Sequence, residues 1–134
     1  MNCFLDAHTL LWSALDTGRL SAAAKSAILD TGNDIHVSMV SFWEISLKYS
    51  TGRLELKGIV PDDFPKISDD MGFSFLELMP ETVATSYKLP KAHNNDSFGR
   101  LIAWQTIKSG MTLLSRDKIF DKYAKYGLKR LWLG

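Results

Sequence analysis

Residues 1–12 of the chain read Met1-Asn2-Cys3-Phe4-Leu5-Asp6-Ala7-His8-Thr9-Leu10-Leu11-Trp12. The apolar run from Cys3 to Leu5 is typical of a short buried strand. It stops at a carboxylate, Asp6, and a helical spacing of apolar residues follows at once. A charge between a strand and a helix lies at the carboxyl edge of a sheet, where open α/β folds bind their ligands. Other acids that reach this edge are therefore the first candidates for a site.

Length and composition are those of an ordinary globular protein. With 134 residues we expect one domain, spanning 1–134. Hydrophobic residues make up 46% of the chain and charged residues 23%, and the formal net charge is +1. This balance excludes a strongly basic nucleic-acid binder, but it leaves room for a local basic patch.

The N-terminal residues and the cysteine content indicate a cytoplasmic location. The chain has one cysteine, Cys3, within an apolar run, which suits a reducing compartment and allows no disulfide framework within the chain. Asp6 and His8 interrupt what would have to be the apolar core of a secretion signal. No apolar run approaches the roughly 20 residues of a membrane span, so we expect no membrane association.

Short apolar strands alternate with helices along the whole chain. We expect strands at 3–5, 35–37, 73–78, 111–115 and 129–132. We expect helices at 7–15, 22–29, 61–72, 80–87, 97–109 and 118–126, with another opened by Ser38 or Ser41 and ended by Gly52. Residues 53–60 are ambiguous, and 89–96 form a polar loop. The alternation predicts an α/β fold with a mainly parallel sheet covered by helices on both faces.

Three further acids stand at junctions like that of Asp6. Glu44 lies in the first turns of a helix, Asp96 precedes the helix at 97–109, and Asp117 follows the strand at 111–115. In a parallel sheet all strand-to-helix junctions share one edge, so Asp6, Glu44 and Asp117 should cluster there. Asp96 would join them if its helix crosses the same edge.

Each acid also has a purely structural interpretation. Asp6, Asp96 and Asp117 are well placed to cap helix N-termini. Ser41 and Glu44 have the spacing of a capping box. Several unpaired carboxylates on one edge would instead repel one another and require a cation. All-oxygen ligands select Mg²⁺ or Mn²⁺, which suit phosphoryl chemistry.

Several motifs in order resemble the PIN-domain family, and the VapC-like toxins of bacterial toxin–antitoxin pairs most of all. The motifs are Phe4-Leu5-Asp6-Ala7-His8-Thr9-Leu10-Leu11-Trp12, Val37-Ser38, Ser41-Phe42-Trp43-Glu44-Ile45, Leu89-Pro90, Leu101-Ile102-Ala103 and Leu113-Leu114-Ser115-Arg116-Asp117. The resemblance implies a three-layer α/β/α fold and a Mg²⁺- or Mn²⁺-dependent endoribonuclease. It also implies a homodimer and inhibition by a small antitoxin protein.

By this resemblance the metal-binding acids fall on Asp6, Glu44 and Asp117, with Ser115 supporting the site. The family's third acid falls on Gly99, which has no side chain to offer a metal. Asp96 is one helical turn from this position and could share its face. We therefore expect Asp6, Glu44, Asp96 and Asp117 as metal-binding and catalytic residues.

Two functions remain open on these residues. One is a ribonuclease in which Arg100 and Arg116 bind the RNA phosphates. The other is a catalytically weakened PIN domain that binds RNA or a protein without cutting, as Gly99 suggests. A structure-specific DNA nuclease would use the same chemistry, but the small chain leaves no room for a long helical arch.

Overall fold

The computed structural model describes residues 1–90 and 96–133. Its centre is a five-stranded sheet in the order β3-β2-β1-β4-β5, and every neighbouring pair of strands is parallel. The strands are β1 Asn2–Leu5, β2 Asp34–Ser38, β3 Ser74–Leu76, β4 Thr112–Leu114 and β5 Lys129–Leu131. The predicted, mainly parallel sheet is thus confirmed and is parallel throughout.

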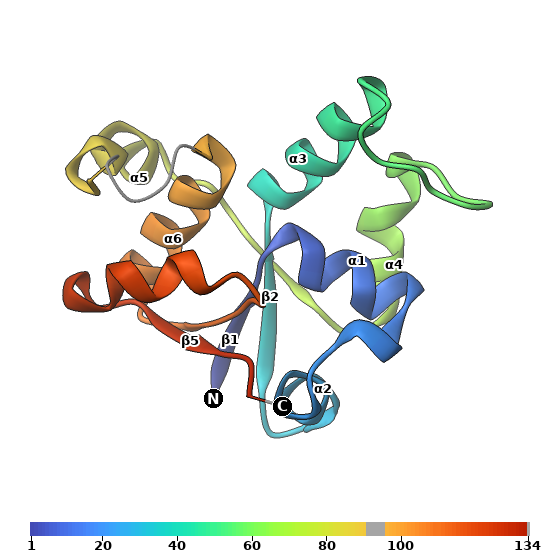
Figure 1. Cartoon of the computed structure of the whole chain (residues 1–134), viewed down its shortest axis with the longest axis horizontal. Helices are drawn as coiled ribbons and strands as arrows, with labels where there is room; N and C mark the ends of the chain where they lie inside the picture. Colours follow the sequence, from blue (N-terminus) through green and yellow to red (C-terminus); the bar gives the residue numbers. More distant parts are fainter. Residues whose placement is uncertain (91–95, 134) are drawn as a thin grey trace.

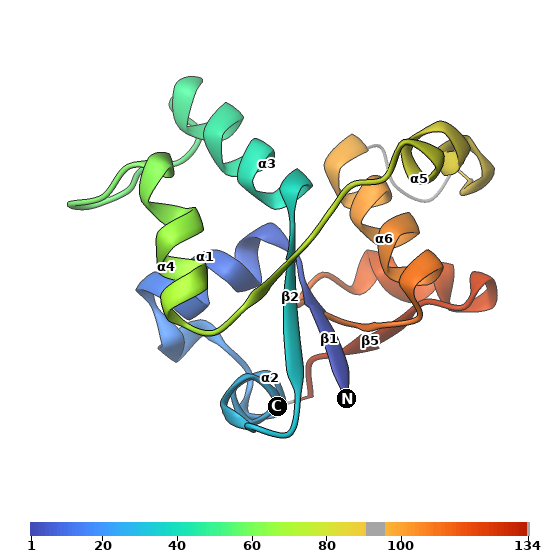
Figure 2. The same ribbon diagram turned by 180° about the vertical axis from the view of Figure 1, so that it is seen from behind.

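Helices cover both faces of this sheet (Figure 1). The α-helices are α1 Ala7–Leu15, α2 Ala22–Leu29, α3 Met39–Ser50, α4 Phe64–Asp70, α5 Pro80–Thr85 and α6 Ser97–Ser109. Short 3₁₀ helices are η1 Thr17–Arg19, η2 Pro61–Asp63, η3 Ser86–Lys88 and η5 Lys118–Tyr126. Figure 2 shows from behind that α1, α3 and α4 lie on one side, and that α5 and α6 lie on the other. The three-layer α/β/α prediction is confirmed.

The core is divided by the central strand β1. Cys3 and Leu5 pack into a buried cluster with residues of α1, α3 and α4, whereas Phe4 packs into a second cluster with residues of α6 and η5. Successive side chains of a strand point to opposite faces, so a strand buried on both sides carries a continuous apolar run. This explains why residues 3–5 show no alternation of polar and apolar side chains.

Most predicted elements are present, with differences at their ends. The third α-helix begins at Met39 and is capped by Ser38, whose hydroxyl accepts a hydrogen bond from the Val40 amide. Residues 118–126 form a 3₁₀ helix that ends at Gly127 with a φ of 102°. Positions 91–95 of the predicted polar loop lie outside the described residues.

Within residues 1–90 and 96–133, none of the helices combines the length and apolar character that crossing a bilayer requires.

Candidate functional site

Strand register brings Asp6 and Ser115 to the same place on the sheet edge. Leu5 at the end of β1 is paired with Leu114 at the end of β4, and each strand is followed by one of these polar residues. Both side chains are buried, with Asp6 8% exposed and Ser115 fully buried. The carboxyl edge of the sheet therefore carries a buried carboxylate beside a buried hydroxyl.

Hydrogen bonds hold the Asp6 carboxylate in one orientation. Its Oδ1 accepts from the Thr9 amide at 2.9 Å and lies 2.7 Å from the Thr9 hydroxyl. Its Oδ2 accepts from the Ser115 hydroxyl at 2.5 Å. The predicted helix cap is thus present, but the contact with Ser115 joins Asp6 to a strand that is distant in sequence.

Ser115 links Asp6 to Asp117. Its hydroxyl donates to Asp6 and accepts a hydrogen bond from the Asp117 amide at 3.1 Å. The Asp117 carboxylate caps η5 by accepting from the Ile119 amide at 3.0 Å. The Ser115 carbonyl in turn accepts from Arg130 Nη1 at 3.0 Å. One hydroxyl therefore sets the spacing between two of the predicted acids.

A cavity of about 340 Å³ opens over these two acids. It is lined by Asp6, His8, Trp12, Arg116, Asp117 and Lys118. Arg116 and Lys118 stand on either side of Asp117 in sequence, so cationic groups border the acidic edge. The cavity thus pairs carboxylates suited to a hard cation with side chains suited to phosphate.

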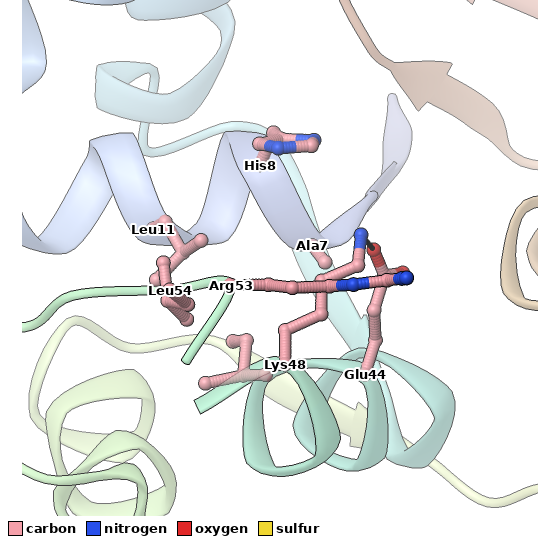
Figure 3. A pocket seen from close by; sticks show the side chains of 8 residues that line it. Ala7, His8, Leu11, Glu44, Lys48, Arg53 and Leu54 are labelled. Atoms are coloured by element: carbon pink, nitrogen blue, oxygen red, sulfur yellow. Dashed lines mark hydrogen bonds and ion pairs between the residues drawn. The ribbon is translucent and has the colours of Figure 1, made fainter. Parts of the chain in front are cut away.

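Glu44 lies on an adjoining cavity. This second cavity, also about 340 Å³, is lined by Ala7, His8, Leu11, Glu44, Ile45, Lys48, Arg53 and Leu54. His8 lines both cavities, so they meet at this side chain. Glu44 is 5% exposed and accepts a hydrogen bond from Lys48 Nζ at 2.5 Å (Figure 3). The prediction of a capping box between Ser41 and Glu44 is wrong. The helix α3 begins earlier, at Met39, and the Glu44 carboxylate accepts its hydrogen bond from Lys48, one turn further along the helix.

Asp96 and Arg100 lie in different surroundings from these acids. Asp96 caps α6 by accepting a hydrogen bond from the Phe98 amide at 3.0 Å, and it lines neither of the two cavities. Arg100 lines a cavity with Trp43 and Tyr87 instead of joining Asp6 and Asp117. Gly99 is buried within α6. Of the predicted residues, Asp6, Ser115, Arg116 and Asp117 come together, and Glu44 is their neighbour.

The donor set fits a hard divalent cation in its chemistry. Asp6 and Asp117 supply carboxylate oxygens at one edge, and Glu44 already holds a cationic group, the Lys48 ammonium, on its buried carboxylate. Among residues 1–90 and 96–133, however, no three His, Cys, Asp or Glu residues gather into a metal-type cluster.

No site role was predicted from the sequence for Thr9, Lys48 or Arg53. Thr9 follows Asp6 by three residues, which is the usual distance between a cap and the amide that it accepts from. Lys48 follows Glu44 by four residues, the spacing of a helical ion pair. Both signals were readable in the sequence. The contact of Arg130 with the Ser115 carbonyl depends on the β4–β5 pairing and has no local signal.

Known proteins resemble this chain over most of its length. The family model described as "PIN domain" matches residues 3–126, which is most of the chain. The chain is 26% identical over 114 residues to ribonuclease VapC22 of Mycobacterium tuberculosis (strain ATCC 25618 / H37Rv), covering 85% of both chains.

Two solved structures have the same fold. One is VapBC2 from Rickettsia felis bound to a DNA fragment from its promoter, with a TM-score of 0.67, 14% identity, and coverage of 98% of this chain and 99% of that one. The other is FitAB bound to the IR36 DNA fragment, with a TM-score of 0.59, 14% identity, and coverage of 96% and 93%. Together with the family match over residues 3–126, these findings lead to one conclusion: this chain belongs to the PIN-domain family.

Proposed function

We propose that this protein is a metal-dependent endoribonuclease and the toxin of a toxin–antitoxin pair. The observation that carries the proposal is the Asp6–Ser115–Asp117 arrangement at the carboxyl edge of the sheet. It is supported by membership of the PIN family and by the similarity to a ribonuclease of the VapC type.

In this proposal Asp6, Glu44 and Asp117 hold a Mg²⁺ or Mn²⁺ ion, and Asp96 at the start of α6 is the assisting acid. Such an ion, when bound, supplies polarisation of a phosphate oxygen and activation of a water molecule that attacks the phosphorus. Thr9 and Ser115 keep the Asp6 carboxylate oriented, because each donates to a different carboxylate oxygen.

The cationic side chains around the acidic edge have a separate task. Arg116 lines the cavity with Asp6 and Asp117, so its planar guanidinium is available to bind an RNA phosphate there. Arg100 would bind a different phosphate of the RNA, in the separate cavity that Trp43 and Tyr87 also line. RNA is the proposed substrate, with its phosphodiester bonds as the site of cleavage.

We further propose a small VapB-like antitoxin protein and a second copy of this chain as partners. The antitoxin proposal is supported by the likeness to VapBC2 and FitAB, which are two-component assemblies by name. The homodimer proposal rests on the resemblance to VapC-like toxins.

The direct test is cleavage of RNA by the purified protein with added Mg²⁺ or Mn²⁺. We expect Asp6→Asn to reduce the rate by about 100-fold or more, which corresponds to a barrier increase of about 2.7 kcal/mol. The exposed Asp69→Asn is the matched control and should cleave like the wild type. Equal cleavage by the wild type and Asp6→Asn would overturn the mechanism.

A second candidate function is a PIN domain that binds RNA or protein without cutting. Two observations favour it: Gly99 occupies the position of an expected acid, and the described acids form no three-member metal cluster. Gly99→Asp distinguishes the two functions. If this variant gains Mn²⁺ binding and cleavage that the wild type lacks, the natural protein is a binding module. If the wild type already cleaves RNA efficiently, the binding-module function is excluded.

A further inference from the structure

The cavity beside Glu44 has an excess of positive charge. Its charged side chains are one carboxylate, Glu44, and two cations, Lys48 and Arg53, and the exposed ring of His8 lines the same space. Lys48 is paired with Glu44 at 2.5 Å. Among the described residues the Arg53 guanidinium has no hydrogen-bond or ion-pair partner. A cavity with an unmatched guanidinium next to an acidic edge is suited to a phosphate group.

The end of α3 places Arg53 in this cavity. The amides of Arg53 and Leu54 both donate to the Lys48 carbonyl, at 2.9 and 3.2 Å. In this tight turn Gly52 adopts a φ of 76°, a left-handed conformation that glycine tolerates better than other residues. The chain therefore folds back over the last turn of α3, and Figure 3 shows the Arg53 and Lys48 side chains both directed towards the Glu44 carboxylate.

The Lys48–Glu44 pair differs from an ordinary pair on a helix surface. The comparison is Lys66–Asp70, which has the same spacing, but whose side chains are 80% and 61% exposed. The side chains of Lys48 and Glu44 are 31% and 7% exposed. Charged side chains this deeply buried are rarely found without a paired group of opposite charge. Lys48 supplies that group from within the chain.

We propose that this cavity binds a phosphate of the RNA substrate through Lys48 and Arg53, and that Lys48 becomes available only when a divalent ion replaces it on Glu44. The proposal rests on the proposed nuclease function and deepens it. Lys48 first compensates the charge of Glu44. Once the ion takes over that charge, the Lys48 ammonium can turn to the phosphate, next to the Arg53 guanidinium.

This exchange couples the binding of metal and RNA. An ion and an ammonium group compete for the same carboxylate, so Lys48 lowers the affinity of the site for metal. The displaced ammonium then raises the affinity for RNA. By linkage, RNA that engages Lys48 must strengthen metal binding by the same factor. Arg53 forms no ion pair with Glu44 among the described residues, so its effect on the metal affinity should be smaller than that of Lys48.

The metal side of the proposal is tested by Mn²⁺ titration of the full chain, followed by electron paramagnetic resonance, without any RNA. Lys48→Gln keeps most of the side-chain length and removes the charge. We expect it to bind Mn²⁺ about threefold more tightly than the wild type, as suits a partly exposed ion pair. Lys66→Gln, which breaks the exposed pair, is the matched control and should leave the Mn²⁺ affinity unchanged.

The RNA side is tested by fluorescence anisotropy with a labelled single-stranded oligoribonucleotide of mixed sequence in the presence of Ca²⁺, its integrity being checked on a gel. We expect Lys48→Gln and Arg53→Gln each to weaken binding severalfold. Each should reduce the slope of log affinity against log salt by about 0.7, the value for one lost phosphate contact on a single strand. Arg53→Gln should raise the Mn²⁺ affinity less than Lys48→Gln does, and Lys66→Gln should leave both measurements unchanged.

Two results would overturn the proposal. If Lys48→Gln binds Mn²⁺ no more tightly than the wild type, Lys48 does not compete with the ion and the pair only stabilises α3. If neither Lys48→Gln nor Arg53→Gln changes the RNA affinity or its salt slope relative to Lys66→Gln, the cavity is not a phosphate site. Both results are independent of the Asp6→Asn cleavage test, so failure of this proposal is distinguishable from failure of the nuclease function.

Discussion

At the scale of single residues, the Ser115 hydroxyl is the centre of the acidic edge. It is fully buried, donates to Asp6 and accepts from the Asp117 amide. A side chain that is both donor and acceptor can join a carboxylate to a backbone N–H, and an aspartate or an alanine at this position could not. The orientation of the Asp6 carboxylate and the position of the Asp117 amide, at the start of η5, therefore both depend on the Ser115 hydroxyl oxygen.

Replacing Ser115 by alanine tests this role. We expect Ser115→Ala to lower the free energy of unfolding by about 1–3 kcal/mol, because the Asp117 amide loses its acceptor and Asp6 loses a donor. Urea denaturation at neutral pH measures the change. The control is Ser50→Ala, whose exposed hydroxyl bonds only to the Leu47 carbonyl in its own helix. A loss no larger than that of the control would show that Ser115 is not a link in the fold.

At the scale of elements, an ion pair ties η5 to β5. The Arg130 guanidinium donates to both carboxylate oxygens of Asp121, at 2.8 and 3.0 Å, and also to the Ser115 carbonyl. The hydrogen bonds from Arg130 hold the pKa of the Asp121 carboxyl below its ordinary value. Arg130 therefore connects β5 to Ser115, the residue that links Asp6 to Asp117.

This pair predicts a pH dependence of stability. A carboxyl with a lowered folded-state pKa stabilises the fold above its unfolded-state pKa of about 3.9, and the effect is lost as the pH falls through the folded-state value. We expect Asp121→Asn to be less stable than the wild type by about 0.5–1 kcal/mol at pH 7, since the carboxylate is largely exposed.

Thermal unfolding from pH 7 to pH 2.5 measures this difference, which should shrink towards zero at the acid end. Glu55→Gln, at an exposed acid without an ion pair among the described residues, should follow the wild type across this range. A stability difference between Asp121→Asn and the wild type that stays constant with pH would contradict the claim that the Arg130 ion pair lowers the pKa of Asp121.

At the scale of the whole molecule, β1 separates the two buried clusters of apolar side chains. Phe4 is fully buried on the side of α6 and η5, and Leu5 is fully buried on the side of α1 and α3. Asp6 directly follows the last residue of this strand. Stability of the sandwich and placement of the site thus come from neighbouring residues of one strand.

Removing the Phe4 ring should therefore destabilise the whole protein. We expect Phe4→Ala to reduce the free energy of unfolding by about 3–5 kcal/mol, a large share of the roughly 5–15 kcal/mol typical of a folded protein. Chemical denaturation followed by circular dichroism measures this loss. Leu29→Ala, at a side chain that is 70% exposed, should change stability by less than about 0.5 kcal/mol. A similar effect of both substitutions would mean that the second cluster contributes little.

The elements were predictable because their signals are local. Apolar runs marked the strands, and Asp6, Asp96 and Asp117 each cap the helix that the sequence predicted for them. The start of α3 was less certain, since Ser38 and Ser41 are both possible caps and only the end of β2 distinguishes them.

The amino-acid sequence by itself determined the alternation of strands and helices, the parallel sheet and the edge to which Asp6 and Asp117 belong. These follow from periodicity, from capping and from the rule that parallel strands present their ends at one edge. Only the tertiary structure decided that Ser115 joins those two acids, that Glu44 pairs with Lys48 in an adjoining cavity, and that Arg100 lies elsewhere. The reason is physical: such contacts depend on strand register and side-chain direction between segments far apart in the chain, and no local pattern carries that information.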